Sequence, residues 1–489
     1  MNELLKRLGI GALIGLLAGF VINYGTNFEG FFLTDLLDGY EYQSYDARMR
    51  SGVAGSEEAS IDTVVIIDIE QQSTLPVEEG GLGRYFNWPQ AYHGQLIDVV
   101  TSGEPAALLF DIIFDPENTF NFDLVNALNS DNTPNDEYLA DVTNQFLLSN
   151  DPTRMVYSTY ESQKTYHALV FEGEDSLIFI YKMDSEPEGY DRPDHLIQIP
   201  DDQARRLPKA DRLGNTYPDL LQASVRTGSA NFPQDNDGII RRSPTAIWFE
   251  GPNHVYPSLT LAGAMDILGV PNDGLDYDFD NLILTLRNSS GIVVRKIPID
   301  EKGRMYVNYY GYYKTFYYLP YMYCMDPEML DPSYWKGKVA IVGASLPGLM
   351  DLRNTPVQET FAGVEIHANV IHSILQNEFV SITDANTNLW SIIILCVLLG
   401  VLVSIPSKPL YTLPVPVVVI VAWVIFTYNE FLTGLVMWEI VRPAISMGGT
   451  YLGIFLYNFL IVEKDKRFLK DTFGTYISPE LIDQMYDNK

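Results

Sequence analysis

The sequence predicts an α/β domain outside the cytoplasmic membrane, joined to four transmembrane α-helices and a cytoplasmic signalling helix. Long apolar runs near both ends, with basic residues beside them, predict the membrane part. Runs of β-branched residues that alternate with amphipathic segments predict the α/β part. We therefore divide the chain into residues 1–24, 25–388, 389–462 and 463–489.

The apolar runs set the number of crossings. Residues 8–22 are apolar or glycine, follow Lys6 and Arg7, and lack a small-x-small cleavage site after them, which favours a signal anchor. A cleaved leader is the alternative, because the run is short for a span. Three further runs reach the length that a bilayer needs: 389–405, 410–428 and roughly 441–462.

Basic residues in the short loops set the orientation. Lys6 and Arg7 precede the first run, Lys408 lies between the second and third, and Lys464 opens a basic cluster after the fourth. The connection 429–439 has two glutamates and no lysine or arginine. With four crossings, all the basic positions lie on one side, so we expect a multi-pass protein of the inner membrane with both termini cytoplasmic and the sensor domain outside.

The charge belongs to the outer segment. The net charge is −31, and acidic and basic residues are equal in number outside residues 25–388. Such a surface excludes a nucleic-acid partner and favours cationic over anionic ligands. Cys324 and Cys396, the two cysteines, fall in different solvents, so we expect no disulfide.

The outer segment has the pattern of a parallel sheet. Residues 63–69 form a continuous β-branched run, a helical stretch follows over 88–102, and a second buried-type strand covers 106–113. This spacing predicts a right-handed strand, helix, strand unit. Residues 338–343 predict another strand, followed by a helix over 364–375, so strands distant in sequence close the domain.

Eight blocks of this segment carry a family resemblance. They are 44–50 (SYDARMR), 67–70 (IDIE), 88–89 (WP), 110–114 (FDIIF), 237–242 (DGIIRR), 256–259 (YPSL), 336–344 (KGKVAIVGA) and 363–369 (GVEIHAN). Their order over 31–378 resembles the CHASE2 sensor domain, and the later apolar runs agree with that family. The resemblance implies a receptor for an extracytoplasmic ligand or protein. The polar, poorly patterned residues 116–210 depart from it and are interpreted as an insertion.

The tail carries a second resemblance. Residues 473–482 (FGTYISPELI) are similar to the segment ahead of the catalytic domain in bacterial class III adenylate or guanylate cyclases. That resemblance implies a homodimeric output domain with two divalent ions, Mg²⁺ or Mn²⁺, which makes a cyclic nucleotide. The chain reaches Lys489 before any metal-binding aspartate, so we expect part of a longer cyclase, inactive by itself and without a cofactor. A membrane scaffold without catalytic output and a kinase receptor are the alternatives.

Acidic residues at strand ends form the candidate ligand site. Asp68, Asp111 and Asp115 are predicted at the carboxyl ends of adjacent parallel strands, where α/β sheets bind ligands, and Glu70 lies beside Asp68. Together they suit a divalent or organic cation. The alternative, which we favour, is that they cap helices and form structural ion pairs. The partners in those pairs would be Arg241 and Arg242.

Two further motifs in the outer segment have structural interpretations. The loop 343–348 (GASLPG) follows a strand but lacks GxGxxG spacing and a Walker lysine, so a tight turn is favoured over an anion site. His367 and His372 have too few convergent ligands around them for zinc, which favours structural histidines.

Two motifs concern association in the membrane. Gly11, Gly15 and Gly19 form overlapping GxxxG steps that permit close helix packing, against either a second copy or a later helix of the same chain. Apolar residues at alternating steps of three and four predict a short parallel coiled coil, with a solvated helix as the alternative. That stripe consists of Phe459, Val462, Lys466, Leu469, Phe473 and Tyr476.

Overall fold

The computed structural model divides the chain into two compact units, Val53–Val380 and Met1–Gly52 with Ser381–Lys489. Each unit is described by itself. The structure describes residues 2–26, 32–55, 60–85, 88–114, 152–172, 182–183, 186–187, 190–214, 217–346, 352–406 and 411–462.

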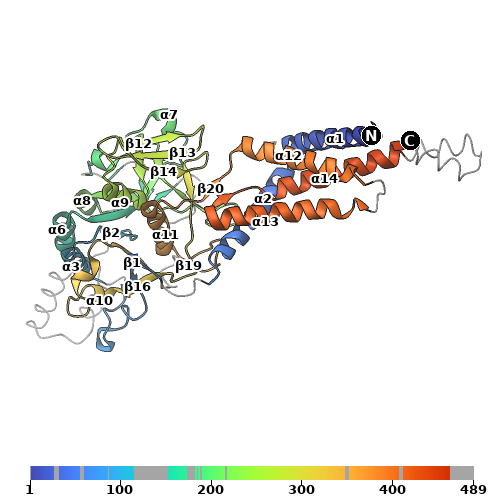
Figure 1. Cartoon of the computed structure of the whole chain (residues 1–489). Coiled ribbons are helices and arrows are strands. Elements are labelled where there is room, and N and C mark those ends of the chain that lie inside the picture. The colour runs from blue at the N-terminus through green and yellow to red at the C-terminus, as the bar shows by residue number, and fades with distance from the viewer. Residues whose placement is uncertain are drawn as a thin grey trace, which may run out of the picture. The chain divides into compact units, whose positions relative to one another are not determined.

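A six-stranded parallel sheet organises the unit Val53–Val380 (Figure 1). Its strand order is β16-β1-β17-β2-β3-β8, and every neighbouring pair is parallel. The strands are β1 (Ile61–Ile69), β2 (Ala107–Phe110), β3 (Thr165–Leu169), β8 (Arg226–Ser229), β16 (Phe316–Pro320) and β17 (Val339–Ala344). In the central strands, β1 from Val64 onward, β17 up to Gly343 and all of β2 are buried, as their continuous apolar runs require.

Helices cover both faces of this sheet. One face carries α3 (Gln90–Ser102), α6 (Pro152–Ser162), α8 (Pro218–Ala223) and α10 (Tyr321–Cys324). The other carries α9 (Leu259–Leu268) and α11 (Gly363–Gln376) (Figure 1). Ser258 caps α9 by accepting a hydrogen bond from the Leu261 N–H. Residues 363–374 of α11 are all buried, so this helix lies between the sheet and the rest of the unit.

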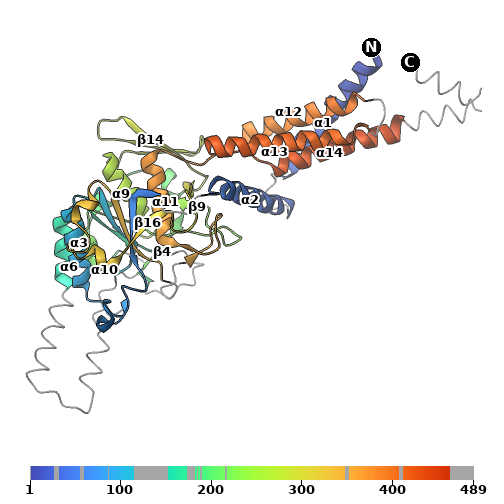
Figure 2. The ribbon, with the colours of Figure 1, turned by 60° about the horizontal axis from the view of Figure 1, so that its bottom comes forward.

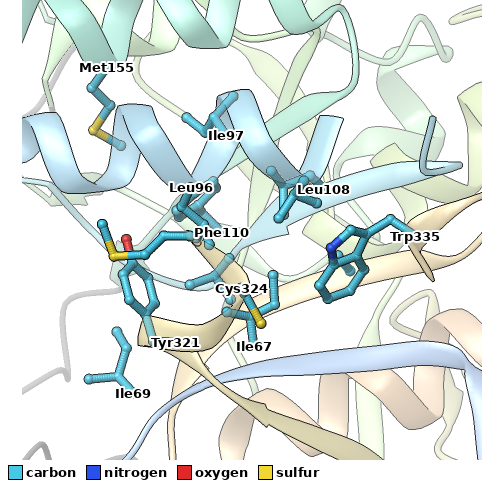
Figure 3. Packing of buried hydrophobic residues seen from close by; sticks show 14 of the residues in the cluster. Ile67, Ile69, Leu96, Ile97, Leu108, Phe110, Met155, Tyr321, Cys324 and Trp335 are labelled. Carbon is cyan, nitrogen blue, oxygen red and sulfur yellow. The ribbon is translucent and has the colours of Figure 1, made fainter. Parts of the chain in front are cut away.

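The main apolar core lies between the sheet and α3. Figure 3 shows Ile67 and Ile69 of β1 and Leu108 and Phe110 of β2 among its side chains, with Trp335 at one end. Because side chains alternate along a strand, the residue between Ile67 and Ile69, Asp68, faces the opposite side, toward α11. The sheet therefore separates an apolar α3 face from a face that bears polar residues.

Smaller elements surround the central sheet. They comprise β4 (Phe171–Glu172), β5 (Lys182–Met183), β6 (Lys209–Ala210), β7 (Arg212–Gly214), β9 (Arg242–Pro244), β10 (Ala246–Phe249), β11 (His254–Pro257), β12 (Leu275–Asp278), β13 (Ile283–Arg287), β14 (Val293–Pro298), β15 (Arg304–Tyr306), β18 (Leu352–Arg353), β19 (Phe361–Ala362) and α7 (Asp201–Ala204). They pair as β4-β7-β5, β11-β10-β6, β12-β13-β14, β15-β9 and β18-β19.

Two expectations about this unit need correction. The strands β1 and β2 are not adjacent, because β17 inserts between them, and periodicity alone does not give the pairing order. In addition, α6 and β3 fall within residues 116–210, which the sequence suggested were an insertion. Since β3 is an internal strand of the sheet, this part belongs to the core. The strand β3 was not predicted because two of its buried residues, Thr165 and His167, are polar and interrupt the apolar pattern.

The second unit is a helical bundle. It contains α1 (Asn2–Thr26), α2 (Phe32–Gly52), α12 (Ala385–Ser404), α13 (Pro414–Gly434) and α14 (Val441–Tyr457), continued by the π-helical turn η7 (Asn458–Val462). The short strands β20 (Ser381–Ile382) and β21 (Val436–Met437) pair in parallel. Asp384 caps α12 by accepting hydrogen bonds from the N–H groups of Asn386 and Thr387.

Three described helices are long and apolar enough to cross a membrane: Leu4–Gly25, Ala385–Ser404 and Pro414–Gly434. By length and apolar composition, the described residues thus show three of the four predicted membrane helices. The fourth, α14, has 17 residues before its hydrogen bonding changes at Asn458, and Arg442 lies in its first turn. Its length and its charged residue place α14 outside this set of three.

Candidate functional site

The acidic residues of the predicted site lie around the carboxyl end of β17. Asp68 pairs with Gly343 across the β1–β17 ladder, and the Asp111 N–H donates to the Val342 carbonyl 2.9 Å away on the other side of β17. Two strand spacings, roughly 10 Å, therefore separate the backbones of the two aspartates. Asp115 lies outside the described residues.

Asp68 closes the loop that follows β17. Its carboxylate accepts hydrogen bonds from the Ser345 N–H at 2.9 Å and from the Ser345 hydroxyl at 2.7 Å. Burial raises the pKa of Asp68, and the two bonds from Ser345 oppose that shift. The Asp68 carboxylate thus already occupies the Ser345 N–H and hydroxyl, the donors that a bound anion would need.

The first turn of α11 packs directly over this strand end. A Cβ added at Gly343 would lie 2.6 Å from the Val364 Cβ, so only glycine permits the approach. The helix consequently brings Glu365 and His367 to the same face of the sheet as Asp68 and Asp111.

Glu365 is the most heavily bonded carboxylate of this face. It accepts hydrogen bonds from the N–H groups of Lys314 (2.9 Å) and Thr315 (3.0 Å) and from the Tyr318 hydroxyl (2.8 Å). Burial raises the pKa of Glu365 to about 7, and these bonds oppose the shift. The candidate residues from the sequence did not include Glu365. A lone acidic residue in the first turn of an otherwise apolar helix was the available signal.

The nearby aromatic residues connect Glu365 with Asp68. The ammonium of Lys314 lies 5.4 Å from the Tyr313 ring centroid and 5.5 Å from that of Tyr318. Burial raises the pKa of Tyr313, the charges of Asp68 and Glu365 add to this shift, and a hydrogen bond with Ser345 opposes it. Two buried carboxylates therefore share one tyrosine-lined environment.

His367 has one bonded and one unpaired ring nitrogen. It is 2% exposed, its Nε2 lies 3.4 Å from the Asp111 carboxylate, and its ring packs against Phe232. Within the part of the chain that the structure describes, His367 Nδ1 has no hydrogen-bond partner. His372 meets Thr63 through Nδ1 at 3.2 Å. The prediction of structural histidines agrees with the hydrogen bond of His372. It agrees only partly with His367, because one of its ring nitrogens has no partner among the described residues.

Glu70, Arg241 and Arg242 take part in separate networks. Glu70 accepts hydrogen bonds from the N–H and the hydroxyl of Ser73, each at 2.8 Å, and so orders the turn after β1. Asp235 bridges both arginines, and Asp237 and Asp300 extend the network, with an Arg241–Asp237 distance of 2.7 Å. The predicted site residues therefore do not form one site. Asp68 and Asp111 lie at the strand end, whereas Arg241 and Arg242 form ion pairs with other aspartates.

In the helical unit, α2 binds the loop between α13 and α14 (Figure 2). The Glu41 carboxylate accepts hydrogen bonds from the N–H groups of Ile440 and Val441, the latter at 3.0 Å. The guanidinium of Arg48 is fully buried and donates to the Trp438 carbonyl at 2.9 Å. Because Val441 begins α14, Glu41 places a negative charge at that helix N-terminus.

The same loop also contacts the chain just before α12. Ser381 and Ile382 of β20 pair with Val436 and Met437 of β21. The segment that leads into β1 and the segment that follows α11 therefore both attach to residues 435–440. We call this region, with α2 and β20, the juxtamembrane junction.

The glycine stripe of α1 contacts α12 of the same chain. A Cβ at Gly11 would lie 2.3 Å from the Gly400 carbonyl oxygen, and one at Gly15 would lie 2.3 Å from that of Cys396. A Cβ at Gly19 would lie 3.4 Å from the Cys396 Cβ. This is the second of the two packing partners that the sequence allowed.

The predicted coiled-coil stripe is mostly beyond the described residues. Phe459 and Val462 lie in η7. Lys466, Leu469, Phe473 and Tyr476 fall in 463–489, outside the described ranges.

Comparison with known protein families matches residues 17–405 to the CHASE2 domain. The match begins within α1, spans the whole sheet unit and ends after α12. Comparisons with curated proteins and with solved structures gave no match.

Proposed function

The chain belongs to the CHASE2 domain family, whose domains are extracellular sensors, and on this basis we propose that it is a membrane receptor that passes an external signal to a cytoplasmic output. The match from 17 to 405 carries the proposal, because apolar helices of spanning length, α1 and α12, bound the sensor unit in sequence. A sensor held by helices at both of its ends can transmit a change in its shape.

We propose that α14 completes the bundle as a fourth crossing, which places both termini in the cytoplasm of a multi-pass inner-membrane protein. Helical hydrogen bonding continues from Val441 to Val462 through η7. In addition, α14 packs closely on α1, since a Cβ at Gly453 would lie 2.9 Å from the Ile14 side chain. The apolar cluster between α12 and α14 includes Cys396, Met447 and Ile454.

Protease added outside intact cells tests this topology. We expect it to digest residues 25–388 and to leave tags at both termini intact. With only three crossings, the C-terminal tag would be cleaved while the N-terminal tag survived. Disruption of the membrane, after which both tags should be lost, is the control.

The juxtamembrane junction is the proposed path of the signal. The α2 helix leads into the sensor unit and β20 follows it, and both attach to the loop that starts α14. A shift of either segment would change the hydrogen bonds that Glu41 and Arg48 make with that loop. Because helix packing has discrete arrangements, a small shift can alter the balance between two bundle states.

The cyclase resemblance of residues 473–482 supports a cyclic-nucleotide output from a homodimer. Such a catalytic domain would need two divalent ions. In the ranges that the structure covers, no group of three His, Cys, Asp or Glu side chains converges. The metals would belong to a cyclase domain elsewhere in a longer protein.

Replacing Leu469 and Phe473 together by serine tests this output. In a full-length protein we expect the change to abolish signal-dependent cyclic-nucleotide production while the sensor stays folded, because each lost apolar layer costs on the order of 1 to 3 kcal/mol of association. Cysteine crosslinking of the tail should fall in parallel. Unchanged crosslinking and output would contradict a role for the stripe, and absence of cyclic nucleotide in the wild type would favour a scaffold or a kinase receptor.

The pH dependence of sensor stability tests the Glu365 cluster. The folded-state pKa near 7 lies above the ordinary value of 4.5, so the folded chain binds more protons than the unfolded chain between these values. Stability should therefore fall as pH rises through this window, by up to about 3 kcal/mol, and change little above it. Thermal unfolding of Glu365→Gln should show a flatter pH profile than that of the wild type.

The control for this measurement is a second glutamate. Burial also raises the pKa of Glu439 to about 7, in the helical unit. Glu439→Gln should leave the pH profile of the sensor transition unchanged. An identical slope in Glu365→Gln and the wild type would contradict the assignment.

A further inference from the structure

A groove of about 660 Å³ lies between α6 and α8, apart from the carboxyl end of β17. Tyr157 and Tyr160 from α6 line one side, and Tyr217, Asp219 and Gln222 line the other. The volume is in the range of small-molecule sites. None of the sequence motifs accounts for this groove.

Two of the tyrosines that line this groove have exposed side chains. Tyr157 is 63% exposed and Tyr160 is 59% exposed, and they stand three residues apart on one helix, so their side chains are neighbours. Large aromatic side chains left in water on one helix face cost hydration free energy unless something covers them. Tyrosine rings present a negative face to a ligand, which attracts cations.

The charges of the groove agree with the aromatic residues. Arg192 is held by Asp194 through two hydrogen bonds of 2.8 and 2.7 Å, and it also donates to the Ser224 carbonyl, so its positive charge is neutralised within the protein. Asp219, in the first turn of α8, has no ion pair or hydrogen bond with any other described residue. The groove therefore offers one uncompensated negative charge beside tyrosine rings, within a segment that carries the whole net charge of −31.

We propose that the α6–α8 groove binds an organic ammonium cation. The rings of Tyr157 and Tyr160 contact the alkylated ammonium, and Asp219 supplies the opposite charge. Anions are disfavoured by Asp219 and by the field of the domain. A metal ion is disfavoured because three of the side chains are tyrosines that offer rings, whereas hard cations require several oxygen ligands.

Choline and its uncharged isostere, 3,3-dimethylbutan-1-ol, test the proposal as a matched pair of probes. The full chain is placed in phosphatidylglycerol nanodiscs, which contain no choline lipid, and each probe is titrated by calorimetry. We expect saturable choline binding, and binding of the isostere weaker by about tenfold or more, because cation–π attraction requires the charge. Equal binding of the two probes, or no saturable choline binding, would overturn the proposal.

Variants place the binding in the groove. Tyr160→Leu and Asp219→Asn should each weaken choline binding by about threefold or more. The matched controls are Tyr317→Leu, on the exposed side of β16, and Asp202→Asn, an exposed acid on α7, and both should bind as the wild type does. Equal choline affinity in all four variants would show that choline does not bind in the α6–α8 groove. Thermal unfolding verifies that each variant is folded. Binding is measured without any output, so its result is independent of the receptor's signalling.

Discussion

The Arg48→Met variant is expected to release the 435–440 loop from α2 while the sensor unit stays folded. Arg48 is fully buried, and its guanidinium bonds the Trp438 carbonyl and the Ser44 hydroxyl. Methionine fills a similar volume but leaves these acceptors unpaired and removes a positive charge that attracts Glu41. We expect the helical unit to lose about 3 kcal/mol of folding stability.

Amide hydrogen exchange measures this release directly. The N–H groups of Ile440 and Val441, which donate to Glu41, should lose protection, whereas β1 and β17 should keep theirs. Arg50→Met, an exposed position on the same helix, is the matched control and should leave both regions unchanged. Full protection of residues 440–441 in Arg48→Met would mean that the junction is held by other contacts. In a full-length receptor, the released loop should also abolish the response to signal.

The Gly15→Ala variant is expected to separate α1 from α12. Its new methyl group would lie 2.3 Å from the Cys396 carbonyl oxygen, and backbone cannot yield as a flexible side chain can, so the helices must move apart. Overpacking of this kind costs about 1 to 3 kcal/mol. Gly9→Ala is the matched control, because a Cβ at that position would meet no described atom within 4 Å beyond its own neighbours and helix backbone.

Cysteine labelling measures the separation of the two helices. Cys396 is a free, fully buried thiol in the wild type. A membrane-permeant maleimide should label it faster in Gly15→Ala than in Gly9→Ala. Equal labelling rates in the two variants would show that the stripe is not a close helix contact, and labelling of Cys324, buried in the sensor core, reports whether that unit remains folded.

The sequence predicted which segments form strands and helices better than it predicted which strands lie next to each other in the sheet. The runs at 63–69 and 338–343 correspond to β1 and β17, and the helix at 364–375 corresponds to α11, because a continuous apolar run is a local property. Which strands pair is decided by contacts between distant segments. This is why β17 was not expected between β1 and β2.

The candidate site shows the same difference. Because Asp68 and Asp111 lie at the ends of predicted strands, the sequence placed both at the same edge of the sheet. It could not show that Ser345 satisfies Asp68 from the following loop, nor that Glu365 accepts bonds from residues 314 and 315, because these contacts depend on where α11 packs. The arginine network was missed for a similar reason, since Asp235, Asp237 and Asp300 meet only after β9 and β15 have paired.

The position of β17 also bears on how the protein is made. A nascent chain that has exported β1 and β2 still lacks the strand that joins them, because β17 begins at Val339. Until then both strands have open hydrogen-bonding edges and apolar faces, which are sites of aggregation. Folding of the sheet thus awaits residues only shortly ahead of α12, the next candidate span. With the topology proposed above, completion of the domain should nearly coincide with anchoring of its second end, and chains released before Val339 should depend on chaperones or proteases outside the membrane.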